Sequence, residues 1–555
     1  MWSCLLLFVA LVCGVWAFPF DKLDLYEASI SELEFGLDNG HFTSVDLVRA
    51  YLARIDQVNH AGPKLNAVIE TNANGINQAR ALDNERKMTG KRSALHGVPI
   101  LIKDNIATLA SEGMNTTAGS YALLGSIVRN EATVSTKLRK AGAIILGKTN
   151  LSEWSQARGY IPIGWSGRGG QTTNPYFPGA NPCGSSSGSG VAMAIGLAAG
   201  SLGTETDGSI TCPSSFNNVV GIKPTVGLTS RAGVIPISTH QDTVGPIARS
   251  VADAAIILTI IAGRDEADNF TSTAPFPALD YSQFLDTQAI KGKRFGVPRR
   301  VFMNNTLTRV HPSINIEFEK ALGRIRNLGG VVVDPADLPS ADEIPTSQEY
   351  FTGRIQFKVA LNAYIKSLVH VPTNVSSMAD IIAFNDAHKL LEETEGHEDQ
   401  QVLILSEATM GYNSTYHEAL HHNYLISRDR GIDAALKSHN LDALLLPSDG
   451  YTTIPAALAG YPIVTVPLGF HPQDTKPFPE SQKPYETLYP APGIPFGLSF
   501  LGTAYTEPSL IGFAYAYEQH TRTRLERRAY KEAIPTVQLK DVIGDTSDHS
   551  IFFQS

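Results

Sequence analysis

Cysteine is scarce in this chain, with 4 among 555 residues. Cys4 and Cys13 lie close to the N-terminus, which leaves Cys183 and Cys212 for the rest of the protein. A fold held together by several disulfides is therefore excluded. Cys183 and Cys212 flank two turns rich in glycine and serine, and the sequence fits a bridge and a pair of buried thiols equally well.

Long apolar runs and basic clusters are also missing. No stretch reaches the roughly 18 apolar residues that a membrane-spanning helix needs. The formal net charge of −9 and the scattered basic residues argue against a surface that binds nucleic acid. No repeat, low-complexity segment or flexible linker interrupts the chain, and 43% of its residues are hydrophobic. We expect one large globular domain without a nucleic-acid partner or a membrane span.

The N-terminal residues have a different character. Leu5 to Trp16 is apolar and leads into Val15-Trp16-Ala17, a pattern typical of signal-peptide cleavage before Phe18. A buried N-terminal helix is the alternative interpretation. Asn150 belongs to one of six Asn-X-Ser/Thr sequons and is expected to be buried and unmodified. The six sequons are Asn115, Asn150, Asn269, Asn304, Asn374 and Asn413. The sequence thus predicts a signal peptide over residues 1–17 and a secreted glycoprotein.

Short apolar runs alternate with helical patterns, which predicts an α/β domain over residues 18–540, followed by a tail at 541–555. Thr43 and Ser44 cap an apolar stripe of helical spacing. Residues 265–440 are more polar and helical, and we interpret them as a peripheral region that shapes a substrate cleft. Buried strands are expected at Val98–Lys103, Ala143–Leu146, Ala443–Pro447, Tyr461–Phe470 and Gly493–Gly502, and helices at Val191–Gly200 and Pro508–His520.

Lys103, Ser185 and Ser209 are the candidate catalytic residues. A serine hydroxyl needs a base to take its proton, and a lysine serves as that base only when burial keeps it neutral. Lys103 ends an apolar run, although pairing with Asp104 is the plain alternative. Ser209 follows a turn of small residues whose N–H groups can form a nest for an oxyanion. Ser185 lies in a Gly/Ser-rich turn that leads directly into an apolar segment, which is unusual for a linker.

Three segments carry a family resemblance: HGVPILIKDN at 96–105, CGSSSGSG at 183–190 and GTETDGSI at 203–210. Together they resemble the amidase signature family, whose catalytic unit is a Ser-cisSer-Lys triad. The resemblance implies an α/β/α sandwich around a large mixed β-sheet, with Ser209 as nucleophile, Ser185 as bridging serine and Lys103 as base. It also implies an oxyanion site formed by backbone N–H groups of Thr206, Asp207, Gly208 and Ser209.

Some residues depart from the commonest pattern of that family. Asp207 replaces a glycine, Glu205 replaces an aspartate, and Thr211 stands where arginine often follows. The Asp207 carboxylate is expected to disfavour anionic substrates near the nucleophile. These departures resemble the bacterial peptide amidases, which remove the C-terminal amide of peptides. Together with the expected signal peptide, the resemblance implies a secreted amidase that cleaves carboxamide C–N bonds of small-molecule or peptide amides through a serine acyl-enzyme, without metal or cofactor.

Other motifs suggest different functions. Gly142 to Thr149 fits the phosphate-loop expression, but its interior is an apolar run rather than a glycine-rich cradle. Ser186 lies in a G-x-S-x-G string, as in serine esterases, but no buried strand precedes it. His417, Glu418 and His421 form H-E-x-x-H, which would make the chain a secreted zinc metallopeptidase, although a third ligand is not evident. An amidotransferase subunit that acts in charging tRNA is a non-secreted alternative, which the export signal disfavours.

Overall fold

The protein is built around one large mixed β-sheet. A computed structural model describes residues 23–480 and 487–543, so the expected signal peptide and the tail from residue 544 lie outside the described residues. Eleven strands form the sheet in the order β1-β3-β2-β6-β8-β7-β12-β13-β11-β9-β10, and β4 and β5 form a separate pair. The strands are β1 (Val68–Thr71), β2 (Pro99–Lys103), β3 (Ile144–Thr149), β4 (Trp165–Ser166), β5 (Gly170–Gln171), β6 (Gly200–Glu205), β7 (Val220–Lys223), β8 (Thr243–Ala248), β9 (Arg294–Gly296), β10 (Val331–Val333), β11 (Ala443–Pro447), β12 (Ile463–Phe470) and β13 (Pro495–Leu501).

The direction of the strands changes across the sheet. β3, β2 and β6 run parallel to one another, and so do β11, β9 and β10, whereas the strands between β6 and β11 pair antiparallel. All five residues of β2 and all six of β6 are buried, as expected for central strands covered on both faces. The parallel pairing places the C-terminal ends of β2 and β6 at the same edge of the sheet, which brings Lys103 close to Thr204.

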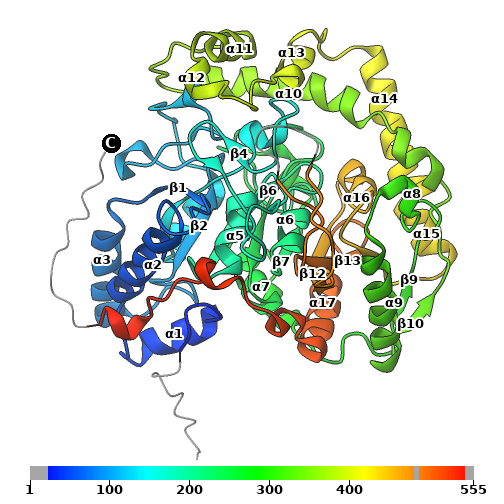
Figure 1. Ribbon diagram of the computed structural model, residues 1–555, viewed down its shortest axis with the longest axis horizontal. Coiled ribbons are helices and arrows are strands. Elements are labelled where there is room, and N and C mark those ends of the chain that lie inside the picture. The colour runs from blue at the N-terminus through cyan, green and yellow to red at the C-terminus, as the bar shows by residue number, and fades with distance from the viewer. Residues whose placement is uncertain (1–22, 481–486, 544–555) are drawn as a thin grey trace, which may run out of the picture.

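Helices cover both faces of the sheet, so the expected α/β/α sandwich is confirmed (Figure 1). α5 and α6 form one group against β6, β7, β12 and β13, while α4, α7 and α17 form another against β3, β8 and β12. The helices are α1 (Ile30–Asp38), α2 (Ser44–Val58), α3 (Gly75–Thr89), α4 (Thr133–Lys140), α5 (Ser187–Ala194), α6 (Thr211–Phe216), α7 (Val251–Ile261), α8 (Asn305–Thr308), α9 (Pro312–Asn327), α10 (Glu349–Ser367), α11 (Met378–Ala387), α12 (Lys389–Glu392), α13 (Gln401–Glu407), α14 (Ser414–Tyr424), α15 (Asp433–Ser438), α16 (Ile454–Ala459) and α17 (Glu507–Thr521).

Local side-chain chemistry determines where α2 begins, whereas burial determines the extent of α5. α2 begins after Thr43, as predicted, because Thr43 and Asp46 cap each other's backbone N–H groups in a capping box. The helix expected at Val191–Gly200 instead spans Ser187–Ala194, and β6 begins at Gly200. Every residue of α5 is buried, so tertiary packing outweighs the poor helix propensity of its serines and glycines.

Residues 265–440 form two different structures. The first part supplies the strands β9 and β10 at one edge of the sheet, which the sequence did not predict because both are only three residues long. The second part is helical: α10, α11, α13 and α14 lie along one side of the molecule, shown in yellow-green at the top of Figure 1. A separate apolar cluster that includes Trp154, Phe357 and Met378 packs this helical layer onto the sheet domain.

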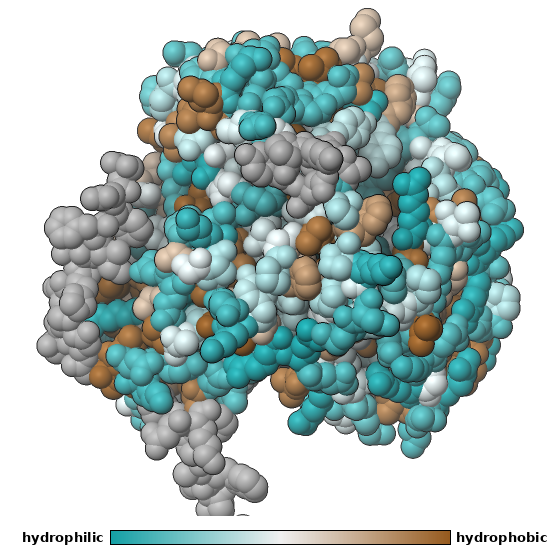
Figure 2. Space-filling model, viewed as in Figure 1, coloured by the Kyte–Doolittle hydropathy of each residue, from teal (hydrophilic) through white to brown (hydrophobic). Residues whose placement is uncertain are grey.

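The visible surface is mostly polar, as expected from a sequence without long apolar runs. The face seen in Figure 2 is mostly hydrophilic, with apolar residues scattered over it. Within residues 23–480 and 487–543, no helix combines the length and apolar character needed to cross a bilayer.

Candidate active site

Lys103 ends β2 and is completely buried. Its Nζ lies 2.7 Å from Ser185 Oγ, 2.9 Å from Thr204 Oγ1 and 3.2 Å from the Thr204 carbonyl oxygen. Burial lowers the pKa of Lys103 to about 7, against the smaller opposing effects of the Asp242 and Glu205 charges. Near neutral pH a large fraction of Lys103 is therefore uncharged and able to accept a proton.

The alternative in which Lys103 pairs with Asp104 is not found. The Asp104 carboxylate points elsewhere and accepts hydrogen bonds from Thr117 N, Thr117 Oγ1 and Gly119 N. Asp104 thus holds the loop that follows β2 in place, while Lys103 faces the two serine turns.

Ser185 lies in a tight turn immediately before α5. The peptide bond between Gly184 and Ser185 is cis, and Cys183 adopts a left-handed φ of 53°. The Ser185 carbonyl oxygen accepts a hydrogen bond from Ser152 N at 3.1 Å. Gly188 cannot carry a side chain, because a Cβ would collide with the Ala67 carbonyl oxygen and lie 2.6 Å from Asn150 N. The Gly/Ser-rich composition therefore reflects close backbone packing rather than flexibility.

Ser209 lies in the turn between β6 and α6. The Glu205 carboxylate fixes this turn by accepting hydrogen bonds from Ile210 N at 2.7 Å and Thr211 N at 2.8 Å. Ser186 N donates to the Ser209 carbonyl oxygen at 3.2 Å, which joins the two serine turns directly. Ser209 is 8% exposed, against 1% for Ser185 and 0% for Lys103, so it is the member of the group that a substrate can reach.

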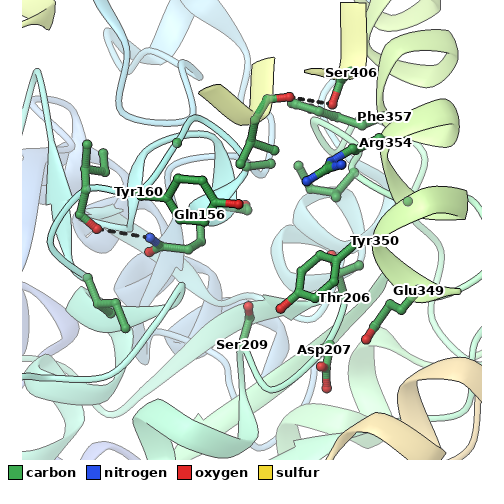
Figure 3. Close-up of a pocket in the computed structure, with 18 of the residues that line it drawn as sticks. Gln156, Tyr160, Thr206, Asp207, Ser209, Glu349, Tyr350, Arg354, Phe357 and Ser406 are labelled. Carbon is green, nitrogen blue, oxygen red and sulfur yellow. Dashed lines mark hydrogen bonds between the residues drawn. The ribbon is translucent and has the colours of Figure 1, made fainter. Parts of the chain in front are cut away.

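Ser209 opens into a cavity of about 710 Å³ (Figure 3). Thr206 and Asp207 line it beside Ser209, and Gly208 is buried behind them with a left-handed φ of 77°. Loop 155–163 forms one wall, and α10 and α13 form another. The region 265–440 thus contributes directly to the cavity, and a volume of this size suits an extended ligand of a few residues.

The floor of the cavity carries two neighbouring carboxyl groups, Asp207 and Glu349. Burial raises the pKa of Asp207 to about 6, and Asp207 Oδ1 has no hydrogen-bond partner. Burial together with the Asp207 charge raises the pKa of Glu349 well above its usual value. The Gln241 side-chain amide donates to Glu349 Oε1 at 2.7 Å. This end of the cavity therefore carries negative charge at neutral pH, shared between the two groups.

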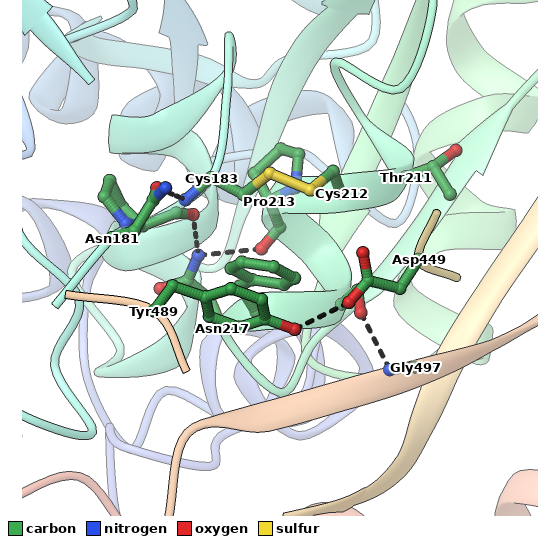
Figure 4. Close-up of a disulfide and its surroundings, with 12 residues drawn as sticks. Asn181, Cys183, Thr211, Cys212, Pro213, Asn217, Asp449, Tyr489 and Gly497 are labelled. Carbon is green, nitrogen blue, oxygen red and sulfur yellow. Dashed lines mark hydrogen bonds between the residues drawn. A yellow bond between two sulfur atoms is a disulfide. The ribbon is translucent and has the colours of Figure 1, made fainter. Parts of the chain in front are cut away.

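A disulfide joins the two serine-bearing segments. Cys183, two residues before Ser185, is bonded to Cys212, three residues after Ser209 (Figure 4). Of the two states that the sequence left open, the bridged one is therefore found. Asn217 supports the same junction, since its amide donates to the Pro182 carbonyl oxygen at 2.7 Å and to the Pro213 carbonyl oxygen at 2.8 Å.

We predict that the Cys183→Ala/Cys212→Ala variant loses both stability and turnover. The bridge spans 29 residues, and a loop of that length is expected to contribute about 3.6 kcal/mol to the free energy of unfolding. Loosening the two turns should also lower kcat by roughly tenfold, because small displacements of reacting groups are costly. Thermal unfolding and steady-state kinetics measure both effects. An unchanged unfolding midpoint together with an unchanged kcat would contradict the role assigned to the bridge.

The competing motifs lack the surroundings that their chemistry requires. Gly142–Thr149 contains the buried strand β3, whose Lys148 donates to the Ile106 carbonyl oxygen rather than facing a phosphate site. Ser186 Oγ is buried and donates to the Thr204 carbonyl oxygen. His417, Glu418 and His421 are exposed on α14. Among residues 23–480 and 487–543, no group of three histidine, cysteine or acidic side chains is placed to hold a metal ion.

The sequence did not reveal the roles of several residues of the site. Thr204 and Glu205 lie within the recognised segment, but their bonding depends on the fold. Glu349 and Arg354 come from α10, more than a hundred residues away, and no motif marks them.

Comparison with known proteins gives a consistent assignment. A sequence profile described as Amidase matches residues 46–511. A putative amidase of Arthroderma benhamiae is 41% identical, covering 91% of this chain and 87% of the relative. A probable amidase of Arabidopsis thaliana is 42% identical, covering 90% and 91%. The crystal structure of the native peptide amidase from Stenotrophomonas maltophilia superposes with a TM-score of 0.80 at 42% identity, over 92% of this chain and 99% of that one. The chain therefore belongs to the amidase signature family of amide-hydrolysing enzymes.

Proposed function

We propose that this enzyme is a serine amidase that hydrolyses C-terminal amides of peptides through an acyl-enzyme on Ser209. The observation that supports this most strongly is the contact between buried Lys103 and Ser185, whose turn is hydrogen-bonded to the turn of Ser209, the residue of the three that lines a cavity of about 710 Å³. The similarity to a solved peptide amidase supports the substrate class.

In the proposed reaction, neutral Lys103 accepts the proton of Ser185 while Ser185 takes the proton of Ser209. Ser209 Oγ attacks the carboxamide carbon, and the oxyanion accepts hydrogen bonds from backbone N–H groups of residues 206–209. The relay then returns the proton to the departing nitrogen, which leaves as ammonia. Water attacks the resulting ester with the same relay as base, and the peptide acid is released.

The test is an ammonia-release assay on a blocked tripeptide amide, with the matching peptide acid as control. The proposal predicts one ammonia per peptide acid formed and no cleavage of internal peptide bonds. Cleavage at an internal bond, or activity that a metal chelator abolishes, would instead favour the metallopeptidase alternative at His417 and His421.

The pH dependence provides a further prediction. Because the pKa of Lys103 is lowered to about 7, the lysine is protonated and unable to act as a base below that pH. We therefore expect kcat/KM for a neutral peptide amide to rise with pH through about 7 and to level off about one unit higher. Rates measured from pH 5.5 to 9 in buffers of constant ionic strength test this. A profile that is flat or falls over this range would contradict the role of Lys103.

We also propose that the protein is secreted and glycosylated. The apolar N-terminal stretch and the Cys183–Cys212 bridge support export. Asn269, Asn304, Asn374 and Asn413 are exposed and open to modification, whereas Asn150 is buried, as expected, and its amide donates to Thr172 Oγ1 at 2.9 Å. When the chain is expressed in a eukaryotic secretory host, the protein recovered from the culture medium should begin at Phe18 and should lose mass on treatment with a glycosidase. Retention in the cell with Met1 or Trp2 at the N-terminus would contradict this.

A further inference from the structure

One face of α10 lines the cavity with charges of opposite sign. Glu349, Tyr350, Gly353, Arg354 and Phe357 follow helical spacing and all contribute to the cavity wall. Glu349 lies beside Asp207, which belongs to the same turn as Ser209, whereas the Arg354 guanidinium enters the cavity on the other side of Tyr350 (Figure 3). The cavity is therefore negative at the reaction end and positive at the distal end.

Arg354 has no acceptor in the described part of the chain. No hydrogen bond or ion pair joins its guanidinium to any residue of 23–480 or 487–543, and its Nε is buried without a partner. Among the described residues, the acidic side chains that line the cavity form no ion pair with Arg354. Glu349 accepts from Gln241, and Glu480 accepts from Asn181 and Thr487. Leaving a buried guanidinium N–H unpaired costs free energy, which a bound acceptor would recover.

The surroundings of Arg354 favour an anion as this acceptor. Phe357 and Val402 make the nearby wall apolar, and an arginine in such surroundings binds a planar carboxylate through two parallel hydrogen bonds. The Asp207–Glu349 pair repels a carboxylate close to the scissile bond. The charges thus define an order along the substrate: a neutral group next to the carboxamide, and an acidic group farther away.

We propose that Arg354 is a specificity-determining residue that binds a carboxylate in the acyl part of the substrate, at least one residue away from the scissile amide. The preferred substrates are then peptide amides with a neutral C-terminal residue preceded by aspartate or glutamate. This inference rests on the proposed peptide-amidase activity.

The experiment compares matched blocked tripeptide amides that carry glutamate or glutamine at the second or third residue from the amide. In the wild-type enzyme, glutamate is expected to raise kcat/KM about 10- to 100-fold over glutamine at one of these positions. In Arg354→Gln this ratio should fall to about one, because the glutamate carboxylate loses its charged partner. Lys366→Gln, which removes an exposed charge from the same helix, is the matched control and should keep the wild-type ratio.

The outcomes separate the inference from the proposed function. Ammonia release from both peptides at equal rates, or a glutamate preference that survives Arg354→Gln, would overturn the role of Arg354 and leave the amidase activity standing. If none of the peptide amides is hydrolysed, the proposed function fails, and binding of the same pairs to the Ser209→Ala protein then decides the inference separately. Equal affinities of the glutamate and glutamine peptides would overturn it there too.

Discussion

Replacing Ser209 with alanine is expected to lower kcat/KM for a peptide amide by on the order of 10⁴-fold or more. Alanine has no oxygen to attack the carboxamide, and the oxyanion site alone provides only residual catalysis. Because Ser209 Oγ faces the cavity and its removal leaves no buried group unpaired, the fold should be unaffected. Ammonia release at saturating and limiting substrate, with a thermal-unfolding measurement, tests this prediction.

A nearby serine provides the matched control. Ser187 is the first residue of α5, directly after the turn that holds Ser185, and its buried hydroxyl has no hydrogen-bond partner in the described residues. Ser187→Ala should therefore keep activity near that of the wild type. Ser186→Ala removes the hydroxyl that joins Ser186 to Thr204, so a modest loss is expected from it. Full activity in Ser209→Ala with complete loss in Ser186→Ala would move the nucleophile to Ser186 and favour the esterase alternative.

Replacing Lys103 with methionine is expected to lower kcat/KM by about 10³-fold or more, since the relay then has no base. The remaining rate should lose its rise through pH 7, because that rise reports the titration of Lys103. Lys103→Arg should not restore activity, since a guanidinium stays protonated at every accessible pH. Steady-state rates of the three proteins across pH 5.5 to 9 provide the measurement.

A second buried lysine tests whether this effect is specific. Lys148 on β3 is also fully buried, and burial lowers its pKa to about 8, but it donates to the Ile106 carbonyl oxygen and Thr116 Oγ1, away from the serines. Lys148→Met should therefore keep the shape of the pH profile, even where stability falls. A profile that persists in Lys103→Met and disappears in Lys148→Met would refute the assignment of the base.

The sequence predicts the central strands well because each buried strand is a short apolar run whose ends can be recognised from the neighbouring residues. Ala443–Pro447 is a short apolar run with defined ends and forms β11 over the same residues. Two features that the sequence did not predict correctly depend on distant contacts. The early start of α5 follows from its complete burial, and β9 and β10 exist only because they extend the edge formed by β11. Short strands at a sheet edge carry no periodicity of their own.

Some residues of the candidate site could likewise be found from local sequence motifs, whereas others are placed there only by the fold. The segments that hold Lys103, Ser185 and Ser209 are compact motifs, so a resemblance could select them, whereas their reactivity depends on burial and on contacts across the sheet. Glu349 and Arg354 are two charged residues among many on helices. Only the packing of α10 around the cavity that Ser209 lines gives them a place there.

The central claim is that Ser209 is the nucleophile, and labelling with a serine-reactive fluorophosphonate tests it most directly. The account predicts a single phosphonyl group, mapped by mass spectrometry to the peptide that contains Ser209, with loss of activity in proportion to labelling. Labelling should be absent in Ser209→Ala, much slower in Lys103→Met and unchanged in Ser187→Ala. Complete inactivation with the label on any other residue, or full activity of a protein labelled at Ser209, would contradict it.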